Sequence, residues 1–351
     1  TLNAGAELSA KDVNVGGNAD ITAETNLTAN DVSVGGDLNA KGQNIHAEHI
    51  KSTGKTRLTA TTGNITAKNL SADGTLDAAA KMNLTVDSVT GKGKTVLTAQ
   101  TGDLTANGTV RTDADAVLTA GETATLGGKT DAGETLTANA GRDFVTNGAV
   151  TTGKELIANV GNDLAMNDLV SAGGSASLTV GRNATLGGTL TTGGNFTMNV
   201  AHDLTVNDAV TTGADFAATV GNDAVTNGIV TTNGALKWSV GNDLMANAAV
   251  LSNGTAQLDA QNVKLSADLM SDKNLAITAK NNIFTKEGTN LSTKADGRLK
   301  ARTADLGGDV HADGTLTVET DEQLEVRNIT AGDNATLNAG TDLFANNVNV
   351  N

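Results

Sequence analysis

The chain has 351 residues and a formal net charge of −15, from 39 acidic and 24 basic side chains. This negative charge argues against a general nucleic-acid partner and against adsorption to an anionic membrane, because both attract basic surfaces. Cysteine is absent, which excludes disulfides and thiolate metal sites. No apolar run approaches the roughly 18 residues of a membrane-spanning helix, so membrane insertion is not expected.

Short runs of alternating apolar and polar residues recur along the whole chain at intervals of 18 to 21 residues. Alternation with a period of two predicts strands with one buried face, and the Gly, Asn and Asp residues between runs predict turns. The first inward residue of each predicted coil is Leu8, Leu27, Ile45, Ile65, Leu84, Leu104, Ala124, Phe144, Leu164, Ala184, Leu204, Ala224, Leu244, Val263, Ile283, Ala304, Leu324 and Leu343.

Three short strands and three turns fit into about 20 residues, whereas an additional helix does not. The sequence therefore predicts an all-β fold: a parallel β-helix of roughly 17 coils with three short strands in each coil. Proline is absent, as expected where every strand is paired on both sides. No linker interrupts the pattern, so residues 1–351 are predicted to form a single β-helical repeat domain.

Residues 44–57 are the first irregular stretch, because apolar and polar residues do not alternate clearly where the first strand of this coil is expected. We interpret them as a turn that bulges out of the coil. His46 and His49 lie three residues apart, which on a strand places them on opposite faces. They are therefore poor joint ligands, and no metal site is predicted.

Residues 103–260 repeat most strictly, with a period of 20 residues. In the third predicted strand a large inward residue accompanies an alanine, as a narrow core filled to native density requires. These inward pairs are Ala116/Leu118, Leu136/Ala138, Leu156/Ala158, Ala176/Leu178 and Phe216/Ala218. Phe196/Met198 and Leu236/Trp238 depart from the rule, so we expect the core to widen there.

Two polar columns accompany this repeat. The first column holds Asp103, Asp143, Asp163, Asp203, Asp223 and Asp243. Such carboxylates are compatible with glycoside cleavage or with a calcium ladder, but a catalytic pair is needed only once and this residue recurs in nearly every coil. We therefore predict that each Asp hydrogen-bonds nearby backbone N–H groups.

The second column holds Asn107, Asn147, Asn167, Asn207, Asn227 and Asn247, with glycine at 127 and 187. Exchange of Asn with Gly predicts a left-handed backbone conformation, and stacked amides are expected to bond from coil to coil. No phosphate loop, GxSxG elbow or HExxH motif is present. The sequence predicts no catalytic residue, cofactor or metal site, and the chain is not expected to be an enzyme.

Residues 284–302 form the second irregular stretch, which we also interpret as a bulging turn, and they are basic within an acidic chain. Arg298, Lys300 and Arg302 alternate with smaller or apolar residues, which predicts a basic stripe on an outward strand face. The stripe is either a solvated face that pairs with Glu319 on the next coil or a contact patch for an acidic glycan or partner. His202 and His311 are isolated and receive no role.

The units have the form GNDLxxNxxVTTGGxLxxxV, and in this form they resemble the repeats of filamentous haemagglutinin, a family of large exoproteins of two-partner secretion that includes the stalks of contact-dependent inhibition effectors. The resemblance implies a right-handed β-helical filament, exported through an outer-membrane (TpsB-type) transporter and then secreted or displayed on a Gram-negative cell surface. There it would contact a host or neighbouring-cell receptor or glycan. The repeat pattern is present from Thr1 onward, and no polar segment that would cap an end coil is visible. We therefore expect a fragment of a longer filament.

Two functions from different classes follow. The first is the shaft of an adhesin or of a contact-dependent toxin carrier, between which the sequence does not decide. The second is a polysaccharide-cleaving β-helix, such as a lyase or a tailspike. That class predicts inserted loops and clustered charged side chains, for which residues 44–57 and 284–302 are the candidates.

Overall fold

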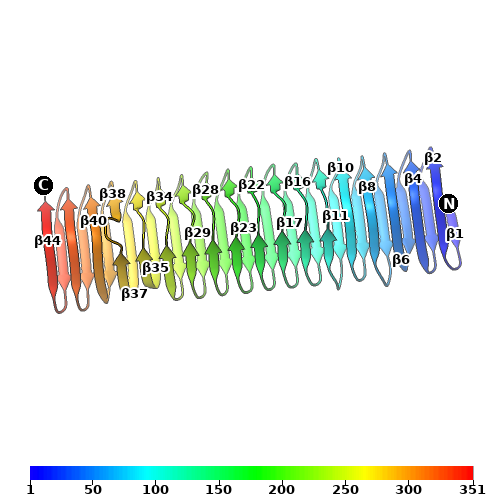
Figure 1. Cartoon of the computed structure of the whole chain (residues 1–351). Coiled ribbons are helices and arrows are strands. Elements are labelled where there is room, and N and C mark those ends of the chain that lie inside the picture. Colours follow the sequence, from blue (N-terminus) through cyan, green and yellow to red (C-terminus); the bar gives the residue numbers. More distant parts are fainter. Residues whose placement is uncertain (351) are drawn as a thin grey trace. The chain divides into compact units, whose positions relative to one another are not determined.

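The computed structural model describes residues 1–350, in which all regular structure is β-strand: 44 strands and no helix. The strands pair in parallel from one coil to the next, as a right-handed β-solenoid of about 17 turns (Figure 1). The predicted fold class is confirmed. Within residues 1–350 no helix is long and apolar enough to span a bilayer. The chain divides into two compact units, residues 1–180 and 181–351.

The first unit begins with coils of two strands. Their strands are β1 (Leu2–Ala4), β2 (Leu8–Val15), β3 (Ala19–Ala23), β4 (Asn26–Val34), β5 (Leu38–Gly42), β6 (Asn44–Ser52), β7 (Thr56–Ala60), β8 (Ile65–Ala72), β9 (Leu76–Ala80), β10 (Leu84–Gly91) and β11 (Thr95–Ala99).

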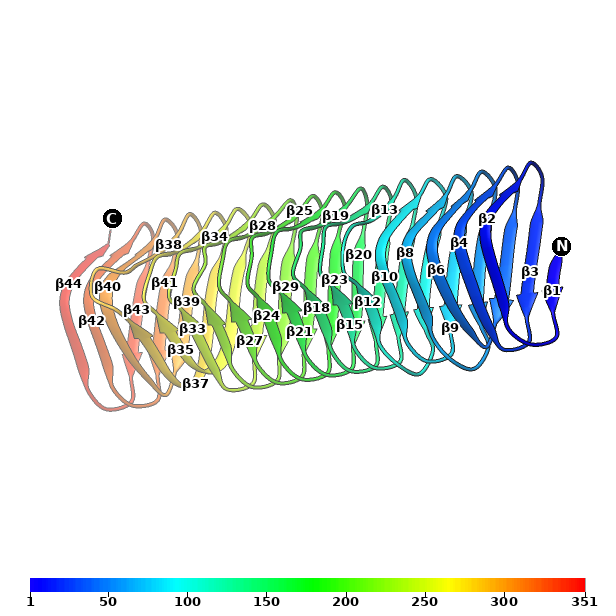
Figure 2. The ribbon, with the colours of Figure 1, turned by 45° about the vertical axis from the view of Figure 1, so that its right-hand side comes forward.

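Coils of three strands follow in the same unit. These strands are β12 (Leu104–Ala106), β13 (Val110–Thr112), β14 (Ala116–Ala120), β15 (Ala124–Leu126), β16 (Thr130–Ala132), β17 (Leu136–Ala140), β18 (Phe144–Thr146), β19 (Val150–Thr152), β20 (Leu156–Val160), β21 (Leu164–Met166), β22 (Val170–Ala172) and β23 (Ala176–Val180). Equivalent strands of successive coils pair with each other, so β12, β15, β18 and β21 form one row (Figure 2).

The second unit opens with coils of three strands. They are β24 (Ala184–Leu186), β25 (Leu190–Thr192), β26 (Phe196–Val200), β27 (Leu204–Val206), β28 (Val210–Thr212), β29 (Phe216–Val220), β30 (Ala224–Thr226), β31 (Val230–Thr232), β32 (Leu236–Val240), β33 (Asp243–Ala246) and β34 (Val250–Ser252).

Longer and less regular strands complete the second unit. They are β35 (Ala256–Leu265), β36 (Leu269–Ser271), β37 (Leu275–Thr285), β38 (Asn290–Thr293), β39 (Gly297–Ala301), β40 (Thr303–Ala312), β41 (Leu316–Thr320), β42 (Leu324–Ala331), β43 (Ala335–Ala339) and β44 (Leu343–Val350).

In most coils the number of strands follows the length of the first corner; β40 is an exception, because it stays continuous although three residues separate the inward Leu306 and Val310. In β8 two outward residues, Lys68 and Asn69, separate the inward Ala67 and Leu70, and the strand continues around the corner. Three residues separate the inward Ala106 and Val110, and there the strand is interrupted. The three-strand prediction is therefore correct for the regular coils, whereas elsewhere two of the predicted strands are continuous.

The two irregular stretches differ. The predicted bulge at residues 44–57 is wrong, because β6 pairs in register with both β4 and β8. The bulge within residues 284–302 is confirmed: a turn over residues 286–289 follows β37, and Gly288 has a φ of 78° there. Glu287 in this turn forms an ion pair with Arg327, which lies two coils further along the chain.

The asparagine column does not have the predicted left-handed backbone. Among the described residues only Asp12, Asp31 and Gly288 have a positive φ. Glycine in these coils instead marks close approach of stacked backbones: a Cβ on Gly153 would overlap the carbonyl oxygen of Gly133 one coil earlier. Asparagine occupies its column for the hydrogen bonds of its amide, which are described below.

The predicted inward residues are buried except in the outermost coils, where Leu8 is half-buried and Leu343 is exposed. The two exceptional coils show how volume is balanced. Phe216 contacts both Phe196 and Trp238 edge to face, with ring centroids 5.5 and 5.4 Å apart. Ala218 pairs with Met198 on one side and Trp238 on the other, without a change of register. Large and small residues are thus balanced between neighbouring coils as well as within one coil.

We expect Ala218→Leu to destabilise the protein by about 1–3 kcal/mol, because Ala218 is 2% exposed and its space is shared with Met198 and Trp238. The measurement is the midpoint of urea unfolding, compared between proteins whose free energy of unfolding falls with urea concentration at the same slope. The control is Ala217→Leu, on the outward side of the same strand, with an expected change within about 0.5 kcal/mol. Equal midpoints for the two variants would contradict the assignment of this column to the core.

Candidate functional site

The aspartate column joins each coil to the next. The Oδ1 atoms of Asp143, Asp203 and Asp223 accept hydrogen bonds from the backbone N–H one coil later, at 3.1–3.2 Å. The same oxygens accept a second bond from the neighbouring Asn side chains, Asn162, Asn222 and Asn242, each at 2.7 Å. The predicted bonding of this column to backbone N–H groups is confirmed. These carboxylates are therefore held in place by hydrogen bonds from the next coil.

Asp203 illustrates the electrostatics of this column. Partial burial raises the pKa of its carboxyl, but hydrogen bonds from Asn222, from the backbone N–H of Asp223 and from His202 outweigh that effect. The pKa of Asp203 therefore lies below its ordinary value. His202 Nδ1 lies 2.9 Å from Asp203 Oδ2, so this histidine has a partner in its own turn.

The asparagine column forms the predicted amide ladders. In the first unit Asn167 Nδ2 donates to Asn147 Oδ1 at 2.9 Å. In the second unit Asn227 donates to Asn207 at 3.1 Å, and Asn247 donates to Asn227 at 2.9 Å. Each bond of this kind contributes about 0.5–1.5 kcal/mol. The column strengthens the stacking of coils.

The prediction that His46 and His49 lie on opposite faces is wrong. Both side chains are exposed, because the outward residues Glu48 and His49 follow each other at the corner of β6 and shift the alternation by one residue. His49 Nδ1 lies 2.9 Å from Asn69 Nδ2, and Glu48 forms an ion pair with Lys68 at 2.7 Å. Within residues 1–350 no group of three or more His, Asp or Glu side chains could hold a metal ion.

The basic stripe lies on the outward face of β39 and of the residues after it. Arg298 Nη2 lies 3.0 Å from Glu319 Oε2, which is the expected partner on the next coil. Arg302 Nε lies 2.9 Å from Glu322 Oε1. Lys300 is exposed and forms no ion pair within the described part of the chain. Two of the three cations are therefore partly neutralised, and Lys300 is the residue most available to an acidic partner.

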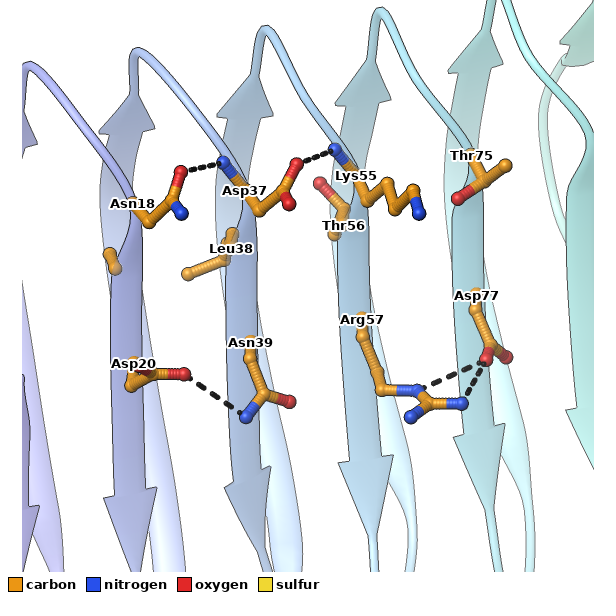
Figure 3. A pocket seen from close by; sticks show the side chains of 11 residues that line it. Asn18, Asp20, Asp37, Leu38, Asn39, Lys55, Thr56, Arg57, Thr75 and Asp77 are labelled. Carbon is orange, nitrogen blue, oxygen red and sulfur yellow. Dashed lines mark hydrogen bonds and ion pairs between the residues drawn. The ribbon is translucent and has the colours of Figure 1, made fainter.

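A polar hollow lies in the first unit, on the face of β3, β5, β7 and β9 (Figure 3). Its volume is about 590 Å³. We define the polar hollow by two rows of side chains that cross these strands: Asn18, Asp37, Lys55 and Thr75 in the first row, and Asp20, Asn39, Arg57 and Asp77 in the second. The inward-facing Ala19, Leu38 and Thr56 lie between the rows and form the floor.

Hydrogen bonds between coils order both rows. Asn18 Oδ1 accepts from the backbone N–H of Asp37 at 2.9 Å, and Asp37 Oδ1 accepts from that of Lys55 at 2.7 Å. In the second row Asn39 donates to Asp20 at 3.3 Å, and the Arg57 guanidinium donates twice to Asp77, at 3.3 and 3.2 Å. The rows are therefore fixed relative to the strands that carry them.

The polar hollow is not evident from the repeat pattern of the sequence. A signal for it exists in the outward column of β3, β5, β7 and β9, which holds Asp20, Asn39, Arg57 and Asp77. The following coils of the same unit carry Val96, Val117, Thr137, Ile157 and Ser177 at the equivalent position. The change from charged to uncharged residues marks the end of the hollow.

Comparison of the chain with protein-family models, with curated proteins and with solved structures finds no match. The geometry of the chain itself therefore carries the functional argument.

The lowered pKa of Asp203 predicts a pH-dependent contribution to stability. A carboxyl whose folded pKa is lowered stabilises the fold above its unfolded pKa, near 3.9, and this contribution is lost as pH falls through the folded pKa. Asp203→Asn should fold, because Asn183 occupies the same column and accepts from the N–H of Asp203 at 3.3 Å. At pH 7 we expect the urea midpoint of the wild type to be higher than that of Asp203→Asn. This difference between the two midpoints should become smaller below about pH 4. A difference independent of pH would contradict the electrostatic explanation.

Proposed function

We propose that the chain is a non-enzymatic shaft segment of a filamentous, surface-displayed protein of the filamentous haemagglutinin type. The single observation that carries this proposal is the recurrence of the same interactions from coil to coil within each unit. The aspartate and asparagine columns make equivalent bonds in successive coils, for example Asn222 to Asp203 and Asn242 to Asp223. A surface built in this way gives reach and stiffness, and it concentrates no chemistry in one coil.

The two irregular stretches bear on the alternative, a polysaccharide-cleaving β-helix. Such an enzyme needs a coil whose side chains depart from the repeat and converge on a substrate. Residues 44–57 follow the register of their neighbours, and the turn at residues 286–289 is held by the ion pair between Glu287 and Arg327. This arrangement favours the shaft over the enzyme.

The cellular setting is part of the proposal and is carried by the repeat pattern. The chain is proposed to be exported through an outer-membrane TpsB-type transporter and to act outside the cell, secreted or at the bacterial surface. Its parent protein is proposed to be an adhesin or a contact-dependent toxin carrier. In both cases the solenoid places a distal part of the protein near a receptor or glycan on another cell.

The shaft proposal predicts no turnover of polysaccharides. The test is incubation of the purified chain with polygalacturonate, alginate and hyaluronan, followed by measurement of reducing ends and of the ultraviolet absorbance of unsaturated uronic products. We expect both signals to equal those of heat-denatured protein. Sustained release of either product would overturn the proposal and support the β-helical lyase.

The basic stripe predicts a contact with acidic glycans that depends mostly on Lys300, because Arg298 and Arg302 are paired with Glu319 and Glu322. We expect Lys300→Ser to elute from immobilised heparin at lower salt than wild type, with an unchanged urea midpoint. The triple Ser variant of residues 298, 300 and 302 should elute earlier still. Lys237→Ser is the control, since Lys237 is exposed on the same kind of strand, three coils before β39. Equal elution of wild type and the triple variant would contradict a contact patch.

A further inference from the structure

We propose that the polar hollow binds a linear, extended and uncharged glycan that lies across β3, β5, β7 and β9, with about one sugar in each coil. This inference deepens the proposed function and rests on it, because it gives the shaft a ligand of defined chemistry. It concerns a face of the first unit that is separate from the basic stripe.

The dimensions of the polar hollow suit such a ligand. The two rows run across the strands, so a chain lying between them passes from coil to coil (Figure 3). Neighbouring coils are about 4.8 Å apart, which is close to the advance of one sugar in an extended, equatorially linked polysaccharide. The volume of about 590 Å³ lies within the range of small-ligand sites. The hollow spans four strands, which sets the expected length of the bound segment at about four sugars.

The charges in the polar hollow favour an uncharged polyol. Three carboxylates, from Asp20, Asp37 and Asp77, are interleaved with the cations of Lys55 and Arg57. The charges nearly cancel, so neither a polyanion nor a polycation is attracted by a field of one sign. Donors and acceptors instead alternate along the rows, as the recognition of hydroxyl groups requires, because each hydroxyl donates one bond and accepts others.

The side chains of the polar hollow are ordered before a ligand arrives and still have hydrogen-bonding capacity. Asp20 uses one oxygen toward Asn39, Asp37 uses one toward the backbone of Lys55, and Asp77 uses one toward Arg57. The second oxygen of each carboxylate accepts no hydrogen bond from residues 1–350, and the exposed Lys55 ammonium forms no ion pair with them. Groups that are already fixed lose little conformational entropy when they bind a sugar.

Length dependence is the first test. The probes are cello-oligosaccharides and chito-oligosaccharides of two to six sugars, titrated into the purified chain by isothermal calorimetry. In at least one series we expect the tetrasaccharide to bind about tenfold more tightly than the disaccharide, and the hexasaccharide to bind no more tightly than the tetrasaccharide. Maltotetraose, whose chain curls, should bind more weakly. Absence of binding in both extended series, or equal affinity at all lengths, would overturn the inference.

Substitution of the lining residues is the second test. Asn39→Ala and Arg57→Ala should each lower the affinity for the tetrasaccharide about five- to tenfold, because each removes hydrogen bonds. Thr137→Ala is the matched control, since Thr137 occupies the same outward column outside the polar hollow; its affinity and urea midpoint should equal those of wild type. Unchanged affinity in both lining variants would overturn the assignment of the site.

The outcomes separate this inference from the shaft proposal. If no oligosaccharide binds, the inference fails and the shaft proposal stands, because that proposal is tested by polysaccharide cleavage. If a bound oligosaccharide is shortened during the titration, as shown by mass spectrometry of the products, the proposed non-enzymatic function fails.

Discussion

Every feature of this protein depends on parallel pairing between coils that are about 20 residues apart in sequence. Each strand takes its hydrogen bonds from the equivalent strands before and after it, and the side chains stack in the same register. The turns are held in the same way, since Asp143 accepts from the backbone of Asp163 and Asn147 accepts from Asn167. A coil therefore has no stable conformation apart from its neighbours, as is typical of solenoids.

This constraint governs the core. A coil cannot widen freely without disturbing the pairing on both sides, so volume is adjusted by exchanging large and small side chains between adjacent coils. Ala218 between Met198 and Trp238 is the clearest case, with unbroken register in β26, β29 and β32. Backbone adjustment occurs at a few positions: Asp12, Asp31 and Gly288 adopt positive φ, and the register shifts within the pairings of β35 with β37 and of β40 with β42. The parallel pairing continues on both sides of each register shift.

The same constraint limits what the surface can do. A polar side chain repeated in every coil meets its own equivalent and is largely used in bonds along the stack, as the Asn207, Asn227 and Asn247 ladder shows. Capacity for a ligand arises where adjacent coils carry different residues at the same position. The polar hollow is such a place, because Asp20, Asn39, Arg57 and Asp77 follow one another in one column. Variation along a column, more than the repeat itself, therefore indicates where polar side chains differ from the stacked ladders.

The sequence by itself determined the coil length, the parallel strands, the inward columns and the hydrogen-bonding role of the aspartates, because a strict period encodes the geometry of one coil and repeats it. It also offered Glu319 as a partner of the basic stripe, and the structure shows that Arg298 makes this pair. Only the tertiary structure decided the backbone conformation of the asparagine column, the exposure of both His46 and His49, the course of residues 44–57 and the position of the polar hollow. These features depend on corner length and on which side chains stack across coils, and alternation within a single strand does not contain that information.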